Sequence, residues 1–276
     1  MFGKTTRTIL CPSCGRLTRA DAAECLICGR RRPGMWGLSD VFHRFFRTVS
    51  PTQIITIACI ALYVLSLVFD PAGALRPRSA FSLLPANPNV LAALGAAGSV
   101  PWQLGHWWTL LTAIYLHGDV LHILFNVLWI RQLGPAVEEL YGPARFFVIF
   151  TVSGVAGFVV SNFVGVPLTV GASGSIFGLL GAMVAFGRRR GGVFGAMVLR
   201  QYGQWALLLF VLGFFMGGVV NNFAHAGGFA GGLGTGLVLS LAERRAETSL
   251  DHLLASGLII VTVAAFVLAL YTAFLG

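Results

Sequence analysis

Seven polar side chains interrupt otherwise long apolar segments of this sequence, and some of them could do chemistry together. Burying a polar group in a lipid-facing segment is costly, so such residues often mark a functional site. A serine hydroxyl becomes a useful nucleophile when a nearby histidine takes its proton. The sequence therefore offers Ser173 as a nucleophile and His225 as its base. The seven residues are His117, His122, Asn126, Ser173, Asn221, Asn222 and His225.

Donors for a developing oxyanion also follow from the sequence around the serine. Ser173 comes directly after Gly171 and Ala172, where we expect a helix to begin, and the first N–H groups of a helix have no partner within it. His122 and Asn126 are four residues apart and so share one helix face, whereas His117 is rotated away from them. Apart from Asp119, which lies beside His117 in the segment 110–130, no Asp or Glu falls inside an apolar segment, so the sequence predicts a Ser-His dyad without an acid.

Each signal has an ordinary packing explanation when it is taken alone. A single histidine in an apolar helix is more often a helix-helix hydrogen bond than a base, and a lone Gly-x-Ser-Gly occurs in tight helix contacts. Two histidines, an asparagine and a glycine-flanked serine in three segments are better explained by one site.

A second candidate site lies in the polar first thirty residues. Two Cys-x2-Cys pairs separated by ten residues supply four thiolates, which suits tetrahedral zinc, and Gly15 and Gly29 permit the tight turns after the pairs. Two disulfides are the alternative, which a cytoplasmic location disfavours. We expect a structural Zn²⁺ in a zinc-ribbon-like head, whose basic residues are left with three possible contacts: anionic lipid headgroups, a partner, or water. The ligands are Cys11, Cys14, Cys25 and Cys28.

The composition explains which solvent surrounds these residues. Hydrophobic residues make up 56% of the 276 and charged residues 11%, with a mean hydropathy of +0.81, which is too apolar for a soluble domain of this length. Lys and Arg outnumber Asp and Glu by 19 to 10. These basic residues cluster between apolar segments, as in cytoplasmic loops, so no nucleic-acid partner is expected. The lipid bilayer is the expected environment.

Seven segments are apolar and close to spanning length. We expect an all-α polytopic protein with a head at 1–34, an amphipathic connector at 35–50, six spans within 51–243, and a cytoplasmic loop and seventh span at 244–276. The predicted spans are 52–69, 110–130, 145–163, 172–187, 204–220, 222–241 and 254–275.

The positions of the basic residues predict the orientation. With the N-terminus in the cytoplasm, all 19 except Arg76 and Arg78 face the cytoplasm, and the C-terminus lies outside. Ser173 then lies about 22 Å from the inner charges at ~1.5 Å per residue, and His225 lies at a similar depth. Both segments run in the same direction and contain Gly-x3-Gly pairs, which allow close helix contact in lipid.

The sequence resembles the rhomboid intramembrane serine proteases over about residues 50–243. The resemblance is carried by His117-x4-His122-x3-Asn126, by Gly171-x-Ser173-Gly174 and by Ala224-His225-x2-Gly228-x3-Gly232. It implies a rhomboid-like six-helix core plus a seventh helix. It also implies that Ser173 is the nucleophile, His225 the base, and His122 and Asn126 the oxyanion donors, with Gly171 shaping the loop and Glu138 acting as a structural acid.

Two positions depart from the pattern of that family. Trp108 is followed by Thr109 where members often have Arg, and Phe177 replaces a Tyr that stacks on the catalytic histidine. The resemblance implies cleavage of membrane-protein substrates in or near their transmembrane segments. Short loops and the absence of eukaryotic sorting signals favour a bacterial plasma membrane. A catalytically silent relative that binds or escorts membrane proteins is the alternative. A transporter is disfavoured because the sequence has no inverted repeat and no intramembrane acid for ion coupling.

Overall fold

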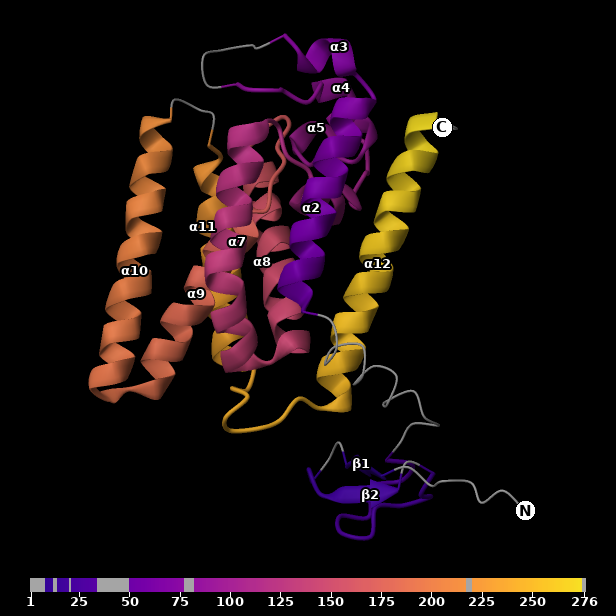
Figure 1. The fold of residues 1–276 in the computed structure, drawn as a ribbon, viewed down its shortest axis with the longest axis vertical. Coiled ribbons are helices and arrows are strands. Elements are labelled where there is room, and N and C mark those ends of the chain that lie inside the picture. Colours follow the sequence, from indigo (N-terminus) through magenta and orange to yellow (C-terminus); the bar gives the residue numbers. More distant parts are fainter. Residues whose placement is uncertain are drawn as a thin grey trace.

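Helices account for most of the architecture in the computed structural model, which describes residues 8–11, 14–19, 21–33, 50–76, 82–216 and 220–274. The long helices of these ranges form one bundle (Figure 1). They are α2 (Pro51–Val68), α7 (Val120–Tyr141), α8 (Pro143–Phe163), α9 (Ser173–Arg190), α10 (Gly192–Phe215), α11 (Asn222–Val238) and α12 (Ser249–Phe274). The connector predicted at 35–50 lies outside the described residues apart from Ser50.

Short elements complete the chain. Between α2 and α7 lie four short α-helices and a 3-10 turn: α3 (Pro71–Ala74), α4 (Pro88–Ala93), α5 (Ser99–Gln103), α6 (Thr109–Thr112) and η2 (Ala113–Tyr115). The head contains an antiparallel pair, β1 (Thr8–Leu10) and β2 (Leu17–Arg19).

Five of the long helices are long and apolar enough to cross a membrane by themselves, namely α2, α7, α8, α10 and α12. α11 has only 17 residues, and the 18 residues of α9 end in Arg188, Arg189 and Arg190. α9 and α11 lie inside the bundle, where α9 packs against α7, α8, α10 and α11. Protein therefore replaces lipid around much of their surface. The predicted all-α polytopic fold is confirmed.

The second span was predicted about ten residues too early. The apolar residues after Trp108 form α6 and η2, and α7 begins only at Val120 because the Asp119 side chain caps it by accepting from the His122 N–H at 2.8 Å. α7 then continues through Arg131 to Tyr141. The fifth span was predicted to begin too late: α10 begins at Gly192, not at 204, and so includes Arg200. Hydropathy alone stops a span at the first charge, whereas a helix can carry charges near the lipid surface.

Glu138 is an acidic residue near the C-terminal end of α7, and hydrogen bonds from the start of α2 stabilise it. Its carboxylate accepts hydrogen bonds from the Thr52 N–H at 2.6 Å and the Thr52 hydroxyl at 2.7 Å. The Ser50 hydroxyl donates to the same carboxylate. These contacts satisfy the charge and tie the start of α2 to α7. The structural acid implied by the resemblance lies at this junction.

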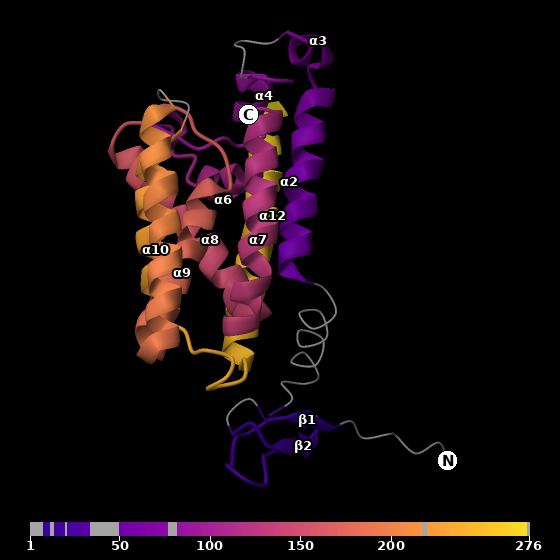
Figure 2. The same ribbon diagram turned by 60° about the vertical axis from the view of Figure 1, so that its left-hand side comes forward.

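α10 and α12 occupy opposite flanks of the bundle in Figure 1, and the turned view of Figure 2 shows α12 behind α7. α10 packs mainly against α9, and α12 packs against α8, α6 and α4. The helices that carry the polar residues, α7, α9 and α11, lie between these flanks. The start of α2 lies at the same end of the bundle as the loops that join α7 to α8, α9 to α10 and α11 to α12.

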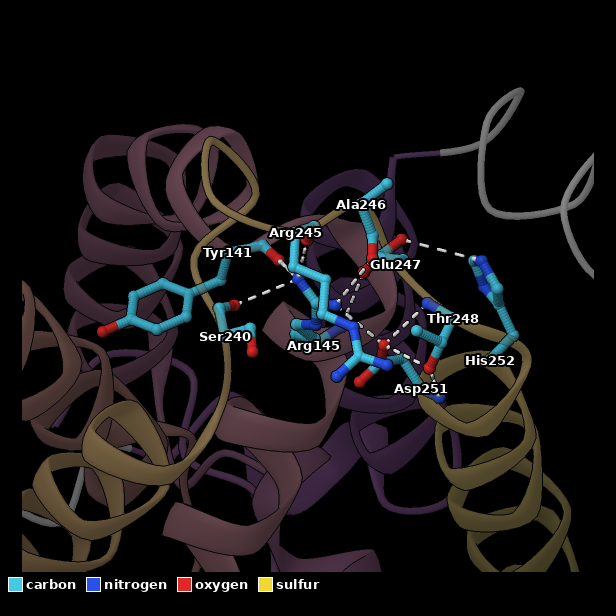
Figure 3. A network of polar contacts seen from close by, with 9 residues as sticks. All are labelled: Tyr141, Arg145, Ser240, Arg245, Ala246, Glu247, Thr248, Asp251 and His252. Atoms are coloured by element: carbon cyan, nitrogen blue, oxygen red, sulfur yellow. Dashed lines mark hydrogen bonds and ion pairs between the residues drawn. The ribbon is translucent and has the colours of Figure 1, made fainter. Parts of the chain in front are cut away.

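A buried arginine joins three of the helices at that end (Figure 3). The Arg145 guanidinium forms an ion pair with Asp251, N to O 2.8 Å, and its side chain is only 2% exposed. The same group donates to four backbone carbonyls, and these bonds link the start of α8 to the end of α7 and to the segment after α11. The ion pair links it to the first turn of α12. The four carbonyls are those of Tyr141, Ser240, Arg245 and Ala246, at 2.9 to 3.3 Å.

Glu247 is buried beside this arginine. One carboxylate oxygen accepts from the Arg145 backbone N–H at 2.9 Å, and the other lies 3.9 Å from Nε2 of His252. Burial raises the pKa of Glu247 to about 7, even though Arg145 opposes the shift. Near neutral pH this carboxyl is therefore present in both its protonated and its ionised form.

This pKa predicts a pH-dependent stability. Because the folded chain binds the proton more tightly than the unfolded chain does, the contribution is fully present below about pH 4.5 and is lost as the pH rises through 7. We expect the wild type to lose about 2 to 3 kcal/mol more than Glu247→Gln between pH 5 and pH 8. Unfolding in detergent micelles at both pH values measures this difference, and equal pH dependences would contradict it.

Candidate active site and metal site

The seam between α9 and α11 brings the candidate serine and histidine to one level. The two helices approach so closely that a Cβ on Gly228 would collide with the Gly174 backbone, and one on Gly232 with that of Gly178. The matched residue numbers increase together along both helices, so α9 and α11 are parallel, as predicted. Ser173 precedes Gly174 by one residue, and His225 precedes Gly228 by three.

Ser173 is the first residue of α9 and is partly exposed. The first hydrogen bond of the helix runs from the Ile176 N–H to the Ala172 carbonyl at 2.9 Å. The N–H groups that precede Ile176 in the first turn therefore have no acceptor within the helix. The loop before the serine is held from outside, because the Gly171 N–H donates to the Ala113 carbonyl at 2.9 Å. This arrangement presents backbone donors beside a serine hydroxyl, as an oxyanion site requires.

His225 lies in the first turn of α11 and is 6% exposed. Its ring stacks on Phe177, with centroids 4.1 Å apart and planes inclined by 15°. The predicted stacking position is therefore filled by the phenyl ring alone. Nδ1 of His225 is buried and has no hydrogen-bond partner within the described part of the chain. The contact with Phe177 therefore fixes the plane of the His225 ring.

His122 packs against the loop that carries the serine. Its Nδ1 accepts from the Gly118 N–H at 3.3 Å, so in the neutral ring the proton is assigned to Nε2. A Cβ built on Gly171, whose φ is +127°, would lie 2.6 Å from that Nε2. The Nε2–H of His122 therefore faces the backbone two residues before Ser173, and only glycine leaves room for it.

Asn126 lies one turn further along α7 and is 4% exposed. Its amide nitrogen donates to the His122 carbonyl at 2.8 Å, which leaves the second N–H of the amide for another acceptor. Its Oδ1 has no partner among the described residues. The side chain is thus anchored by its own helix with one donor to spare.

Three residues support the site in ways that the sequence did not predict. Asp119 caps α7 and so orients His122, and the Asp-x2-His spacing could have revealed this. His117 precedes α7 and does not belong to it. Its buried ring lies edge-on to that of His122, with centroids 5.1 Å apart. Asn221 caps α11 through the Ala224 N–H and donates to Ser161 at 2.6 Å.

The departure at Thr109 has a local explanation. Thr109 begins α6, is 3% exposed, and its hydroxyl donates to the His106 carbonyl at 2.7 Å. The His106 ring stacks on Trp108 with centroids 4.7 Å apart. A short polar side chain closes this turn of the segment between α2 and α7.

The four cysteines of the head converge on one point. Their sulfur atoms lie within 4.8 Å of one another, with Cys11 and Cys28 3.6 Å apart and Cys14 and Cys25 3.8 Å apart. Four sulfurs at ~2.3 Å around one Zn²⁺ would be about 3.8 Å apart, so the cluster fits tetrahedral zinc. All four are free cysteines, which argues against the disulfide alternative.

The two halves of the cluster have the same backbone geometry. The Gly15 N–H donates to the Cys11 carbonyl at 2.8 Å, and the Gly29 N–H donates to the Cys25 carbonyl at 2.9 Å. Both glycines have a positive φ, near +70°, which favours glycine as predicted. When bound, zinc would hold this small head together.

The fold and the comparisons with known proteins define a multi-pass integral membrane protein. The family model of the rhomboid domain matches residues 104–242. The chain belongs to the rhomboid family. It is 36% identical over 148 residues to the putative rhomboid protease YdcA of Bacillus subtilis, which covers 51% of this chain and 72% of YdcA.

Longer relatives match as well. Rhomboid protease GluP of Bacillus subtilis is 35% identical over 162 residues, which are 57% of this chain and 31% of GluP. RHOMBOID-like protein 5 of Arabidopsis thaliana is 33% identical over 182 residues, covering 63% of this chain and 58% of that protein. The chain thus spans about a third of GluP and under two thirds of the Arabidopsis protein.

Proposed function

We propose that this chain is an intramembrane serine endopeptidase that hydrolyses peptide bonds in or near the transmembrane segments of other membrane proteins. The observation that carries the proposal is the parallel seam of α9 and α11. Glycine contacts at Gly174 and Gly228 hold Ser173, at the start of one helix, level with His225, in the first turn of the other. Membership in a family that contains proteases supports the same activity.

The roles follow from the geometry. His225 removes the proton of Ser173 as the hydroxyl oxygen attacks the substrate carbonyl, and the protonated ring then gives that proton to the leaving amine. Water hydrolyses the resulting acyl-enzyme by the reverse sequence. The developing oxyanion accepts hydrogen bonds from the backbone at the start of α9, from Nε2–H of His122 and from the free N–H of Asn126. Phe177 keeps the base in its plane.

The orientation completes the proposal. α7 and α9 both run toward the end of the bundle where loops join α7 to α8, α9 to α10 and α11 to α12, so Ser173, the first residue of α9, lies away from that end. The inner charges of the positive-inside pattern, Arg188, Arg189 and Arg190 among them, lie in the last turn of α9 and in those loops. We therefore place the N-terminus in the cytoplasm, the C-terminus outside, and the site near the outer surface of a bacterial plasma membrane. Water reaches Ser173 from the outer side.

Co-expression with a tagged single-span substrate tests the dyad. We expect Ser173→Ala and His225→Ala each to reduce product formation by at least about 10³-fold. Ser175→Ala is the matched control, because Ser175 lies two residues away on the same helix but faces Gly154 of α8. The Ser175→Ala variant should keep most of the activity. Unchanged cleavage by Ser173→Ala and His225→Ala would contradict the dyad assignment.

The alternative is a catalytically silent relative that binds or escorts membrane proteins. It predicts that the correctly inserted wild type yields no product from any single-span substrate, while GluP assayed in parallel does. Binding of the substrate would then be equal for the wild type and Ser173→Ala.

A further inference from the structure

We propose that the zinc-binding head docks on the cytoplasmic surface of the bilayer in which its own chain is embedded. In this arrangement an apolar apex, Leu26 and Ile27, inserts between lipids, and neighbouring arginines contact anionic headgroups. The proposal rests on the cytoplasmic placement of the head given above and not on the Ser173 chemistry. It assigns a partner to a part of the chain that the proteolytic site does not use.

The apex presents two adjacent, exposed aliphatic side chains at the described surface of the head. Leu26 is 99% exposed and Ile27 is 62% exposed, and they occupy the two positions between the ligands Cys25 and Cys28. Adjacent large aliphatic side chains held out into water usually mark an interaction surface. Transfer of one such side chain out of water favours binding by about tenfold or more.

The apex is also rigid, which lowers the entropic cost of inserting it. The Gly29 N–H donates to the Cys25 carbonyl at 2.9 Å, and the Cys25 N–H donates to the Arg30 carbonyl at 2.8 Å. Both ends of the turn carry a metal ligand. The two aliphatic side chains are therefore presented on a fixed loop.

Basic side chains flank the apex on its C-terminal side. Arg30, Arg31 and Arg32 follow Cys28 after a single residue, Gly29, and are all exposed. Of the acidic residues described in the head, Glu24 pairs with Arg31 at 3.5 Å and Asp21 with Arg19 at 2.9 Å. An apolar tip with an arginine rim matches an anionic bilayer surface, where each basic residue strengthens binding by about fivefold.

The chain itself keeps the head close to this surface. Only 16 residues separate Pro33 from Ser50, which immediately precedes the membrane-crossing helix α2. At about 3.4 Å per residue they reach at most roughly 55 Å. The head is therefore held at a high effective concentration at the membrane, and a weak contact suffices to dock it.

Photo-crosslinking in the full-length chain tests the docking directly. A photoreactive benzoylphenylalanine replaces Leu26 in protein reconstituted into phosphatidylcholine vesicles, with or without 30% phosphatidylglycerol. The matched control places the same group at Thr8, an exposed residue at the start of β1. We expect lipid adducts at position 26, at least about fivefold more of them in the anionic vesicles, and few at position 8.

Further variants identify what holds the head. Arg30→Gln with Arg32→Gln should remove the preference for anionic lipid, and Ile27→Ser should reduce the adducts at position 26. One zinc per chain in each variant shows that the head is folded. Adducts to protein alone, or equal lipid adducts at positions 26 and 8, would overturn the proposal. Adducts retained in a Ser173→Ala background separate it from the proposed proteolysis.

Discussion

Gly232→Ala is expected to abolish cleavage and to destabilise the membrane core. An added Cβ would meet the backbone oxygen of Gly178 at a distance that real Cβ atoms do not reach, and backbone cannot rotate away as a side chain can. α9 and α11 must then separate, which moves His225 away from Ser173. A displacement of about 1 Å costs on the order of 10²-fold in rate, and overpacking costs about 1 to 3 kcal/mol or more.

The same helix offers a control. Gly234 lies two residues further along α11, and a Cβ built there has no atom of the described chain within 4 Å. Gly234→Ala should keep full activity and be as stable as the wild type or more so by up to about 1 kcal/mol, since alanine favours the helix. Cleavage and thermal unfolding of the two variants measure the contrast. Equal behaviour of the pair would mean that close helix contact does not set the site.

Arg145→Met is the second variant with a large expected effect. It removes five hydrogen bonds, which leaves four backbone carbonyls without this donor and the partly buried Asp251 carboxylate with only its Thr248 donors. Breaking a buried ion pair by removing one partner costs about 3 to 5 kcal/mol. We expect a lower unfolding temperature in micelles and faster proteolysis of the segment between α11 and α12, because α12 loses its main polar attachment to α8.

Arg188→Met controls for the loss of a positive charge at the same end of the bundle. Arg188 is exposed in the last turn of α9, so its replacement should change stability by no more than about 0.5 kcal/mol. Adding Asp251→Asn to Arg145→Met should recover part of the loss, since the buried carboxylate is then neutral. If Arg145→Met unfolds like Arg188→Met, the network does not hold α12.

Residue types and spacing were sufficient to predict much of this protein. The apolar segments predicted the helical membrane fold, and glycines at four-residue spacing predicted that α9 and α11 touch. The cysteine spacing predicted the metal site together with its two glycine turns. These predictions succeed because each depends on local chemistry: lipid selects apolar helices, and only glycine allows backbones to meet or φ to be positive.

Other features depend on residues far apart in the sequence. The start of α7 was misplaced because hydropathy does not register the Asp119 cap, and its end because Glu138 is stabilised by Ser50 and Thr52, more than eighty residues away. The Arg145 network likewise joins segments about a hundred residues apart. Hydropathy counts these side chains as exposed charges, yet folding buries them with partners.

The candidate site also has features that depend on residue type and features that depend on the fold. The sequence by itself predicted which residues could react, Ser173 and His225, as a dyad without an acid. Only the tertiary structure decided how they are held: His122 turns its Nε2 toward Gly171, and Phe177 stacks on His225. Reactivity belongs to a side chain and is readable from its type, whereas orientation depends on neighbours that the fold alone brings together.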